Sequence, residues 1–419
     1  MPESVRSDHR SALLAGYLGW TLDAFDFFLV VSCLTAIGKE FHKTDAEMAL
    51  SLTITLAFRP VGAFLFGLLA DRYGRRLPLM IDLIFYSIVE VLSGLAPNYT
   101  TFLILRALFG IGMGGEWGVG ASLAMEKAPA RWRGLLSGFL QQGYAMGFLL
   151  ASVANILLFH RVGWRPLFFL GGLPALLAVF VRMRVKESEV WEKTRHESWG
   201  QLGRAVASHW KIFLYMVVLM TAMNLASHGT QDLYPTFLER QWGFTVERKN
   251  LFSAFSMVGA IIGGTLCGFV SDRIGRRKTM IFALLRAVLA IPLWAFAPTM
   301  MLLFAGGFIM QALVQGAWGV IPAHLAELSP DSVRGFLPGF GYQMGVLFSS
   351  AVPRIEADIA HRTSYSFAMS VTALTVFLLA AIATALGPER RAALFGEGDG
   401  HQRLGHAEEP LADDSSARK

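Results

Sequence analysis

The chain has 419 residues, of which 54% are hydrophobic and only 16% are charged. Soluble domains usually carry about 25% charged residues, so this composition indicates a protein with many membrane-spanning segments. The net charge of +6 does not indicate a nucleic-acid partner, because the basic residues lie mainly in short loops between apolar segments, as orientation signals do. The two cysteines, Cys33 and Cys267, both lie in apolar segments and predict neither a disulfide framework nor a metal site.

Twelve segments are apolar and long enough to cross a lipid bilayer as helices, which takes about 20 residues each. The first six are expected near residues 12–37, 47–70, 77–96, 101–124, 134–159 and 164–182. A polar segment follows, and six more spans are expected near 211–238, 250–270, 278–297, 299–325, 335–358 and 364–386. We predict an all-α membrane protein with an N-terminal six-helix bundle (1–182), a cytoplasmic linker (183–210), a C-terminal six-helix bundle (211–386) and a disordered cytoplasmic tail (387–419).

The basic residues predict the orientation of the chain in the membrane. They gather in the loops on the side of the N-terminus, around residues 72–76, 127–133 and 273–278 and in the linker, whereas the loops on the other side hold fewer. Loops rich in Lys and Arg stay in the cytoplasm. Both termini are therefore predicted to be cytoplasmic, in a multi-pass protein of the cytoplasmic membrane.

Charged residues within the N-terminal spans are the first candidates for function. Asp23 and Asp26 lie three residues apart in the first span, and Glu116 lies in the fourth. Carboxyl groups in a low dielectric can exchange a proton near neutral pH, so each is a candidate proton carrier. Arg59, midway along the second span, offers a planar fork that suits a substrate carboxylate. The alternative for Arg59 is a permanent ion pair with Asp23 or Asp26.

Other polar and aromatic residues of the spans have weaker assignments. Arg106, near the outer end of the fourth span, is expected to reach the interface by snorkelling or, alternatively, to touch substrate. Arg286, in the ninth span, is expected at a helix-packing or lipid-facing position. Several aromatic residues could line an amphipathic cavity, and of these Tyr144 and Tyr342 are predicted to contact substrate.

The most concentrated polar signal lies in the seventh span. Asn224, His228, Gln231 and Asp232 fall at helical positions i, i+4, i+7 and i+8 and so form one polar stripe. Such groups in a membrane helix almost always face an aqueous cavity or a partner. We assign Asn224, His228 and Gln231 to substrate binding and Asp232 to proton coupling. The alternative is a hydrogen-bonded packing seam between two helices.

Nucleotide chemistry is not expected. The run Gly110-Ile-Gly-Met-Gly114-Gly115 is superficially like a dinucleotide loop, but no strand precedes it and it lies in an apolar segment. Close helix packing is the better interpretation. The sequence holds no Walker loop, zincin motif or serine elbow, so we predict no use of ATP, no catalytic residue, no cofactor and no enzyme activity.

An internal repeat relates the two halves. Gly67-Leu-Leu-Ala-Asp71-Arg72-Tyr-Gly74-Arg75-Arg76 recurs 201 positions later as Gly268-Phe-Val-Ser-Asp272-Arg273-Ile-Gly275-Arg276-Arg277. Two six-helix halves in parallel repeat describe a transporter whose substrate site lies between them at the bilayer midplane.

The repeated loops resemble the signature of the major facilitator superfamily. Their glycines allow close helix approach, and their Asp and Arg side chains can form ion pairs that break when the two halves rock. The resemblance implies a gate on the inner side, built from Gly67, Asp71, Arg72, Arg75, Asp272, Arg273 and Arg276.

Within that superfamily, one segment is more specific. The residues Asn224-x-x-Ser227-His228-x-Thr230-Gln231-Asp232-x-x-x-Thr236 resemble the signature of Jen-type lactate and pyruvate permeases, in the sialate:proton symporter group, and Gly19 to Phe27 resemble the same group. Thr230 stands where Ser is expected, and the linker is short and polar where sialate members have extra spans. Arg59 matches an arginine of Jen-type permeases.

These observations together predict a twelve-helix transporter, acting as a monomer in the bilayer, that moves a small organic anion and a proton by alternating access. Lactate or pyruvate is the expected substrate. An anion that enters with one proton carries no net charge, which avoids about 2.3 kcal/mol per 100 mV of opposing potential. The alternatives are a sialate or aromatic-acid proton symporter and, from another class, a membrane sensor that binds but does not transport.

Overall fold

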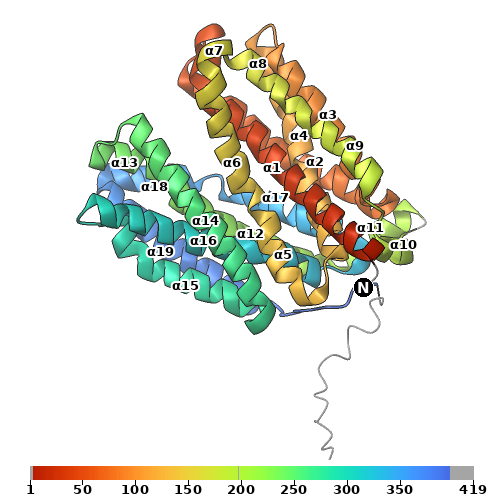
Figure 1. Cartoon of the computed structure of the whole chain (residues 1–419). Helices are drawn as coiled ribbons and strands as arrows, with labels where there is room; N and C mark the ends of the chain where they lie inside the picture. The colour runs from red at the N-terminus through yellow and green to blue at the C-terminus, as the bar shows by residue number, and fades with distance from the viewer. Residues whose placement is uncertain (1–2, 197, 397–419) are drawn as a thin grey trace, which may run out of the picture.

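The computed structural model describes residues 3–196 and 198–396. All regular secondary structure in this part of the chain is helical (Figure 1). Eleven stretches within it are long and apolar enough to cross a membrane. The twelfth crossing consists of α17 (Leu337–Ser349) and α18 (Val352–Arg362), which are too short individually. Proline is tolerated in the first turn of a helix but not in its interior, so Pro353 at the start of α18 explains the break.

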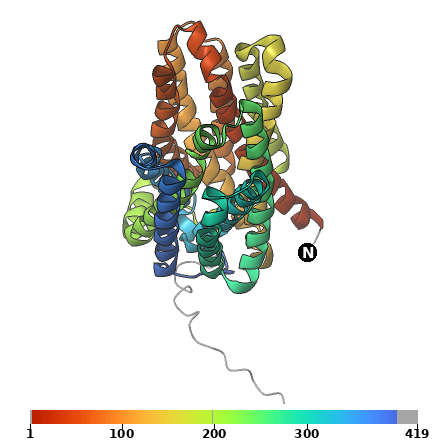
Figure 2. The ribbon, with the colours of Figure 1, turned by 90° about the vertical axis from the view of Figure 1, so that its left-hand side faces the viewer.

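The helices form two bundles that lie side by side in Figure 1. Figure 2 gives a view turned by 90°, in which most helix axes lie roughly along one common axis. The N-terminal bundle contains α1 (Glu3–Glu40), α2 (Asp45–Tyr73), α3 (Arg76–Gly94), α4 (Tyr99–Lys127), α5 (Arg133–Gln141), α6 (Gly143–Ala154), α7 (His160–Val162), α8 (Trp164–Phe169) and α9 (Leu173–Arg184). The C-terminal bundle contains α12 (Trp210–Gln231), α13 (Tyr234–Trp242), α14 (Val246–Ile274), α15 (Arg276–Ala295), α16 (Met300–Leu328), α17, α18 and α19 (Tyr365–Leu386). This is the predicted arrangement of two related six-helix bundles.

Local sequence explains where several helices begin. Thr44 precedes α2, and its hydroxyl accepts a hydrogen bond from the Glu47 amide, while the Glu47 carboxylate accepts one from the Thr44 amide at 2.9 Å. This reciprocal capping box satisfies two amides that a helix start would leave unpaired. Asn98 caps α4 and Ser364 caps α19 in the simpler way, through a side-chain oxygen. These starts follow the turns that link successive spans on the side opposite the start of α1.

Glycines bring α2 and α4 into close contact. A side chain at Gly110 would clash with the carbonyl oxygen of Thr55, and one at Gly114 would clash with the carbonyl oxygen of Arg59. The glycine run of the fourth span therefore serves helix packing, as predicted, and does not form a nucleotide loop. It also holds the backbone of Arg59 against α4, which fixes where that side chain starts.

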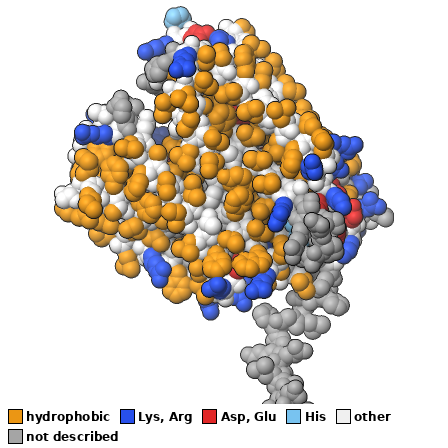
Figure 3. Space-filling model, viewed as in Figure 1, with side chains coloured by type: hydrophobic (Ala, Val, Ile, Leu, Met, Phe, Trp, Pro, Cys, Tyr) orange, Lys and Arg blue, Asp and Glu red, His pale blue; other side chains and the backbone are white. Residues whose placement is uncertain are grey.

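The surface is that of a membrane protein. Hydrophobic side chains cover most of the face drawn in Figure 3, and Lys and Arg gather at its upper and lower edges. Large apolar residues such as Leu289 and Met301 are largely exposed on the outside of the bundles. Such residues would be unfavourable in water but suit contact with lipid tails.

Two segments on the side of the termini differ from simple connections. The linker contains the short helices α10 (Glu189–Thr194) and α11 (Trp199–Ser208). Residues 388–396 of the predicted disordered tail instead pack against both bundles, through hydrogen bonds to Arg133 of the N-terminal half and to Glu327 and Asp331 of the C-terminal half, so the prediction of disorder from residue 387 was wrong for this part. The rest of that tail, residues 397–419, lies outside the described part of the chain.

Candidate transport cavity

A cavity of about 430 Å³ lies between the two bundles. Its lining includes residues of α6, α16 and α17 as well as residues of the second half of α1, the first halves of α2 and α14, and the last turns of α12. The named parts of α1, α2, α12 and α14 lie away from the side where α1 begins and α19 ends, which we call the terminal side. The molecule is hollowed between its halves on the opposite side, at the upper left of Figure 3. The cavity therefore opens away from the terminal side.

Arg59 is the buried cation of this cavity. Its side chain is 5% exposed, and its Nε and Nη2 atoms have no hydrogen-bond partner among the described residues. The predicted alternative was a permanent ion pair with Asp23 or Asp26. Neither carboxylate has a hydrogen-bond partner within the described chain, so that pair is not formed here. Nε and Nη2 of Arg59 are therefore available to an anion.

Aromatic residues from both halves surround this cation. The Tyr342 ring centre lies 5.7 Å from the Arg59 guanidinium carbon, and the same ring packs against Trp117 at 4.6 Å and Trp318 at 5.6 Å. On the other wall, Tyr144 stacks on Trp20 at 5.6 Å. Tyr144 and Tyr342 therefore both line the cavity, in the positions expected of substrate contacts.

The polar stripe of α12 forms the facing wall. Asn224, His228, Gln231 and Asp232 all line the cavity. His228 Nδ1 and Asp232 Oδ2 lie 2.9 Å apart, and both side chains are about one third exposed. Gln231 also donates to Gln311 Oε1 on α16 at 3.1 Å, so the stripe combines a cavity face with one interhelical hydrogen bond of the kind expected for a packing seam.

The other predicted proton carriers lie behind the cavity wall. Asp23, Asp26 and Glu116 are fully buried, and none of them lines the cavity. Asp82 on α3 joins this group: it is fully buried and neither of its carboxylate oxygens has a hydrogen-bond partner in the described chain. Sequence reasoning overlooked Asp82, although an acid within an apolar span was the same signal that identified Asp23.

Arg106 has a structural partner. It is almost completely buried, and its Nη2 donates to Glu90 Oε2 and to Ser93 Oγ, both on α3. The rings of Phe102, Phe109 and Phe168 surround the guanidinium. The predicted snorkelling of Arg106 is therefore wrong, because Glu90 on the neighbouring helix provides an internal partner, and Arg106 does not line the cavity.

A second acid was missed in the C-terminal half. Glu356 on α18 is buried, and its carboxylate oxygens have no hydrogen-bond partner among the described residues. The Asp232 carboxylate interacts electrostatically with the Glu356 carboxyl group. The available signal was again a carboxylate within a predicted span, at residues 335–358.

The repeated loops meet at the terminal side. The Asp71 carboxylate accepts hydrogen bonds from the amides of Gly335 at 2.7 Å and Phe336 at 3.0 Å, which belong to the other half. Asp272 does the same with the amides of Gly134 at 2.8 Å and Leu135 at 2.9 Å. We call these two matched contacts the terminal seam. The sequence repeat thus appears in space as a pair of equivalent contacts between the halves.

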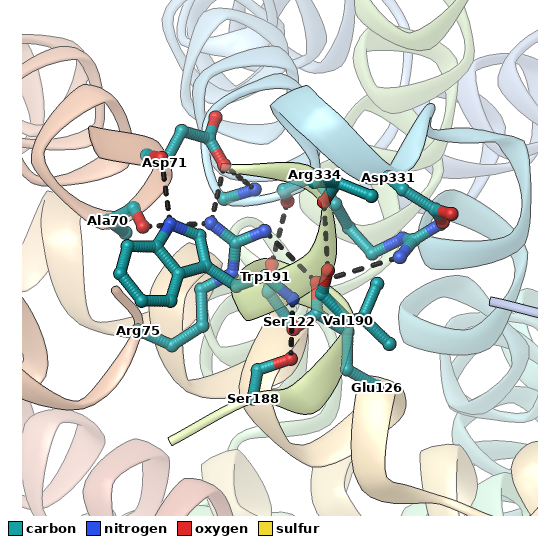
Figure 4. A network of polar contacts seen from close by, with 12 residues as sticks. Ala70, Asp71, Arg75, Ser122, Glu126, Ser188, Val190, Trp191, Asp331 and Arg334 are labelled. Atoms are coloured by element: carbon teal, nitrogen blue, oxygen red, sulfur yellow. Dashed lines mark hydrogen bonds and ion pairs between the residues drawn. The ribbon is translucent and has the colours of Figure 1, made fainter. Parts of the chain in front are cut away.

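Ion pairs support each carboxylate of the terminal seam. Arg75 contacts Asp71 and lies 3.0 Å from Glu126, and Glu126 lies 3.6 Å from Arg334 of the other half (Figure 4). The equivalent set in the second half joins Arg276 to Asp272 at 2.7 Å and to Glu327 at 2.9 Å, with Arg133 3.2 Å from Glu327.

The remaining predicted gate residues lie around the same seam. A side chain at Gly67 would come within 2.9 Å of the Phe336 Cα atom, so glycine allows this close approach. Arg72 donates to the carbonyl oxygen of His196 at 3.0 Å, and the Arg273 guanidinium lies 4.4 Å from the Phe269 ring centre. Gly67 thus permits the close contact between the halves. The contact of Arg72 described here is with the linker, and that of Arg273 is within α14.

Known proteins share this arrangement. The sugar (and other) transporter family matches residues 12–198 and 213–389. A probable 4-methylmuconolactone transporter of Cupriavidus pinatubonensis is 31% identical over 426 residues, covering 96% of each chain. A carboxylic acid transporter protein homolog of Saccharomyces cerevisiae is 29% identical over 379 residues, covering 83% of this chain and 61% of the yeast relative.

The fold has a close counterpart among solved structures. The structure of the major facilitator superfamily proton:xylose symporter XylE superposes with a TM-score of 0.80, covering 94% of this chain and 98% of that one, at 19% identity. At this identity the likeness shows the fold alone. The predicted superfamily is confirmed: the chain belongs to the sugar (and other) transporter family of the major facilitator superfamily, and it is a multi-pass membrane transporter.

Proposed function

We propose that this transporter is a proton-coupled symporter of monocarboxylates. The observation that carries the proposal is the buried guanidinium of Arg59, which lines the cavity and whose Nε and Nη2 have no hydrogen-bond partner among the described residues. Leaving a buried hydrogen-bond donor unsatisfied costs roughly 1–3 kcal/mol, and more when the group is charged. A substrate carboxylate supplies a counter-ion and accepts two parallel hydrogen bonds from the planar fork.

Alternating access follows from the two ends of the same interface. The cavity opens away from the terminal side, while Asp71 and Asp272 close the terminal seam. We assign the terminal side to the cytoplasm, on the basis of its basic loops. Rocking of the two halves would break both matched contacts and expose Arg59 to the cytoplasm. One chain contains both halves, so a monomer suffices.

Proton coupling requires a carboxyl group whose protonation is linked to substrate binding. We assign this role to Asp232, which lines the cavity beside His228, or to one of Asp23 and Asp26, of which Asp23 lies near Arg59. Glu116 is a further candidate behind the wall. Entry of one proton with each anion leaves the cycle electrically neutral, so the membrane potential does not oppose uptake.

Two substrate classes fit the site. The resemblance to Jen-type permeases favours lactate or pyruvate. The cavity favours a second candidate, a ring-bearing acid such as an aromatic acid or a sialate. Its volume of about 430 Å³ falls within the range of about 300–1,000 Å³ that is typical of pockets for drug-sized ligands. Trp20, Tyr144 and Trp318 could stack on a ring, and the Cupriavidus relative is described as a lactone transporter.

The test is uptake into proteoliposomes from a panel of lactate, pyruvate, benzoate, muconolactone and sialate, with and without an inward pH gradient. Accumulation of an acid that depends on the gradient supports symport, and the acid with the highest uptake decides the class. Counterflow separates a transporter from a sensor, since a sensor binds the acid but does not exchange it. Uptake of a neutral sugar and of none of these acids would contradict the proposal.

A further inference from the structure

The chain continues past α19 and runs beneath both halves. Arg133, the first residue of α5, donates from Nη1 to the carbonyl oxygen of Ala393 at 2.9 Å. In the other half, Asp331 Oδ2 accepts from the Gly396 amide at 2.7 Å, and Glu327 Oε1 accepts from the Ala392 amide at 3.2 Å. The backbone of residues 392–396 is thus hydrogen-bonded to each of the two moving parts.

Phe395 occupies the centre of this segment. Its ring centre lies 3.8 Å from the guanidinium carbon of Arg133 and 3.7 Å from that of Arg334. Arg133 belongs to the N-terminal half and Arg334 to the C-terminal half. Each face of an aromatic ring attracts a cation, and the attraction is stronger for desolvated cations such as these two buried arginines. The ring therefore lies against one arginine of each half, and each arginine is also paired with an acid, Arg133 with Glu327 and Arg334 with Asp331.

The backbone of this segment adopts an uncommon conformation at one residue. Ala392 has φ of +59°, a left-handed conformation that residues other than glycine rarely adopt and that persists where the surroundings over-determine it. Leu394, which precedes Phe395 in the sequence, is 61% exposed. The segment thus places one aromatic side chain inside the interface and its aliphatic neighbour outside it.

The two arginines are adjacent in sequence to residues of the terminal seam. Arg133 precedes Gly134, whose amide Asp272 holds, and Arg334 precedes Gly335, whose amide Asp71 holds. Any motion that separates the two seam contacts must also separate Arg133 from Arg334. The Phe395 ring cannot then stay within contact of both.

We propose that Phe395 is a positioning residue of the gate: with residues 392–396 it forms a latch that holds the terminal side closed. The latch must leave at least one arginine before the cavity can open to that side. It goes beyond the transport activity proposed above, and it can be tested without any substrate.

The test measures the distance between the halves on the side opposite the latch. Spin labels are placed by Arg161→Cys on α7 and Arg240→Cys on α13, both exposed near the free ends of the two halves (Figure 1), with the native cysteines replaced by Cys33→Ala and Cys267→Ala. In the full chain, most molecules should show the long distance of the open cavity. Phe395→Ala should shift the ratio of short to long distances by about fivefold or more, the effect expected on losing two cation–π contacts.

Matched variants keep this test decisive. Leu394→Ala changes the exposed neighbour and should leave the distances unchanged, and Phe395→Tyr should retain the latch. A chain ending at Gly396 keeps the latch and should behave as the full chain, whereas one ending at Leu394 should behave as Phe395→Ala. Unchanged distances in both Phe395→Ala and the chain ending at Leu394 would overturn the proposal, as would an equal shift in Leu394→Ala.

Transport assays separate this inference from the proposed function. Phe395→Ala should change the maximal rate of uptake but leave the half-saturating concentration within about twofold, because Phe395 does not line the cavity. If no carboxylate is transported by the full chain and the distances still shift, the proposed function fails and the latch stands. If uptake is confirmed and the distances do not shift, the latch fails alone.

Discussion

Arg59 of the N-terminal half and Tyr342 of the C-terminal half meet across the cavity, with the guanidinium carbon 5.7 Å from the ring centre. An anion bound to Arg59 would therefore lie against a side chain of the opposite half. Because a ligand shifts an equilibrium only by its different affinities for the two states, this placement allows one carboxylate to bias how the halves sit.

The first prediction concerns the shape of the cavity cation. Arg59→Lys keeps the positive charge but loses the planar fork, so uptake at low substrate should fall by about 10- to 100-fold, the loss expected for charge-assisted hydrogen bonds. Initial rates in proteoliposomes give this value. Arg286→Lys is the matched control, since Arg286 is an intramembrane arginine exposed on the outside of the bundle near Phe282. Near-normal uptake by Arg59→Ala would exclude the clamp.

The second prediction concerns the terminal seam. Asp71→Asn and Asp272→Asn each retain one acceptor oxygen where two amides are now held. Each variant should lower the maximal rate of transport by about fivefold or more, while the substrate affinity stays within about twofold, because both residues lie outside the cavity. Equilibrium binding measured beside counterflow separates the two quantities. A variant with weakened binding and normal counterflow would contradict this division of roles.

The third prediction distinguishes the two possible roles of Asp232. Asp232→Asn keeps the size and removes the titrating group beside His228. If Asp232 carries the proton, accumulation driven by a pH gradient should be lost, while exchange of substrate for substrate persists. If Asp232 only orients the imidazole, driven uptake should persist with an altered pH optimum and His228→Ala should abolish it. Should both variants keep both activities, Asp232 and His228 serve only packing.

The fourth prediction concerns stability. Glu90→Gln leaves Arg106 buried without its anion, which should destabilise the fold by about 3–5 kcal/mol, as expected for a broken buried ion pair. Asp82→Asn is the matched variant on the same helix, because Asp82 has no hydrogen-bond partner to lose among the described residues. Thermal unfolding of the purified proteins, monitored by tryptophan fluorescence, should show a lower midpoint for Glu90→Gln than for Asp82→Asn. Equal midpoints would show that the ion pair does not stabilise the bundle.

The sequence predicted the architecture well and the site in part. The repeat that links Asp71 with Asp272 reflects real contacts between the halves, because the same backbone geometry occurs in both. The prediction for Arg106 was wrong, because its position along the span does not reveal that Glu90 on the adjacent helix provides a partner. Composition alone assigned Phe395 to a disordered tail, and a single aromatic residue gives no signal of what it will contact.

Buried acids were missed for a different physical reason. Asp82 and Glu356 lie in spans whose existence was predicted correctly, but helical spacing within one span does not reveal which helix each side chain will face. The stripe from Asn224 to Asp232 was visible because four polar groups share one face. A lone acid has no such pattern, so its environment emerges only from the packing of separate helices.

The placement of Glu90 and Arg106 also has a consequence for the insertion of the helices into the membrane. Glu90 lies on α3, whereas its partner lies on α4, which is synthesised later. An Asp at the centre of a membrane helix adds about 2.5–3.5 kcal/mol to the free energy of insertion, and α1 carries Asp23 and Asp26 near its middle. The early helices therefore reach a favourable environment only when later ones arrive, so the N-terminal half should enter the bilayer as a group of helices and not one by one.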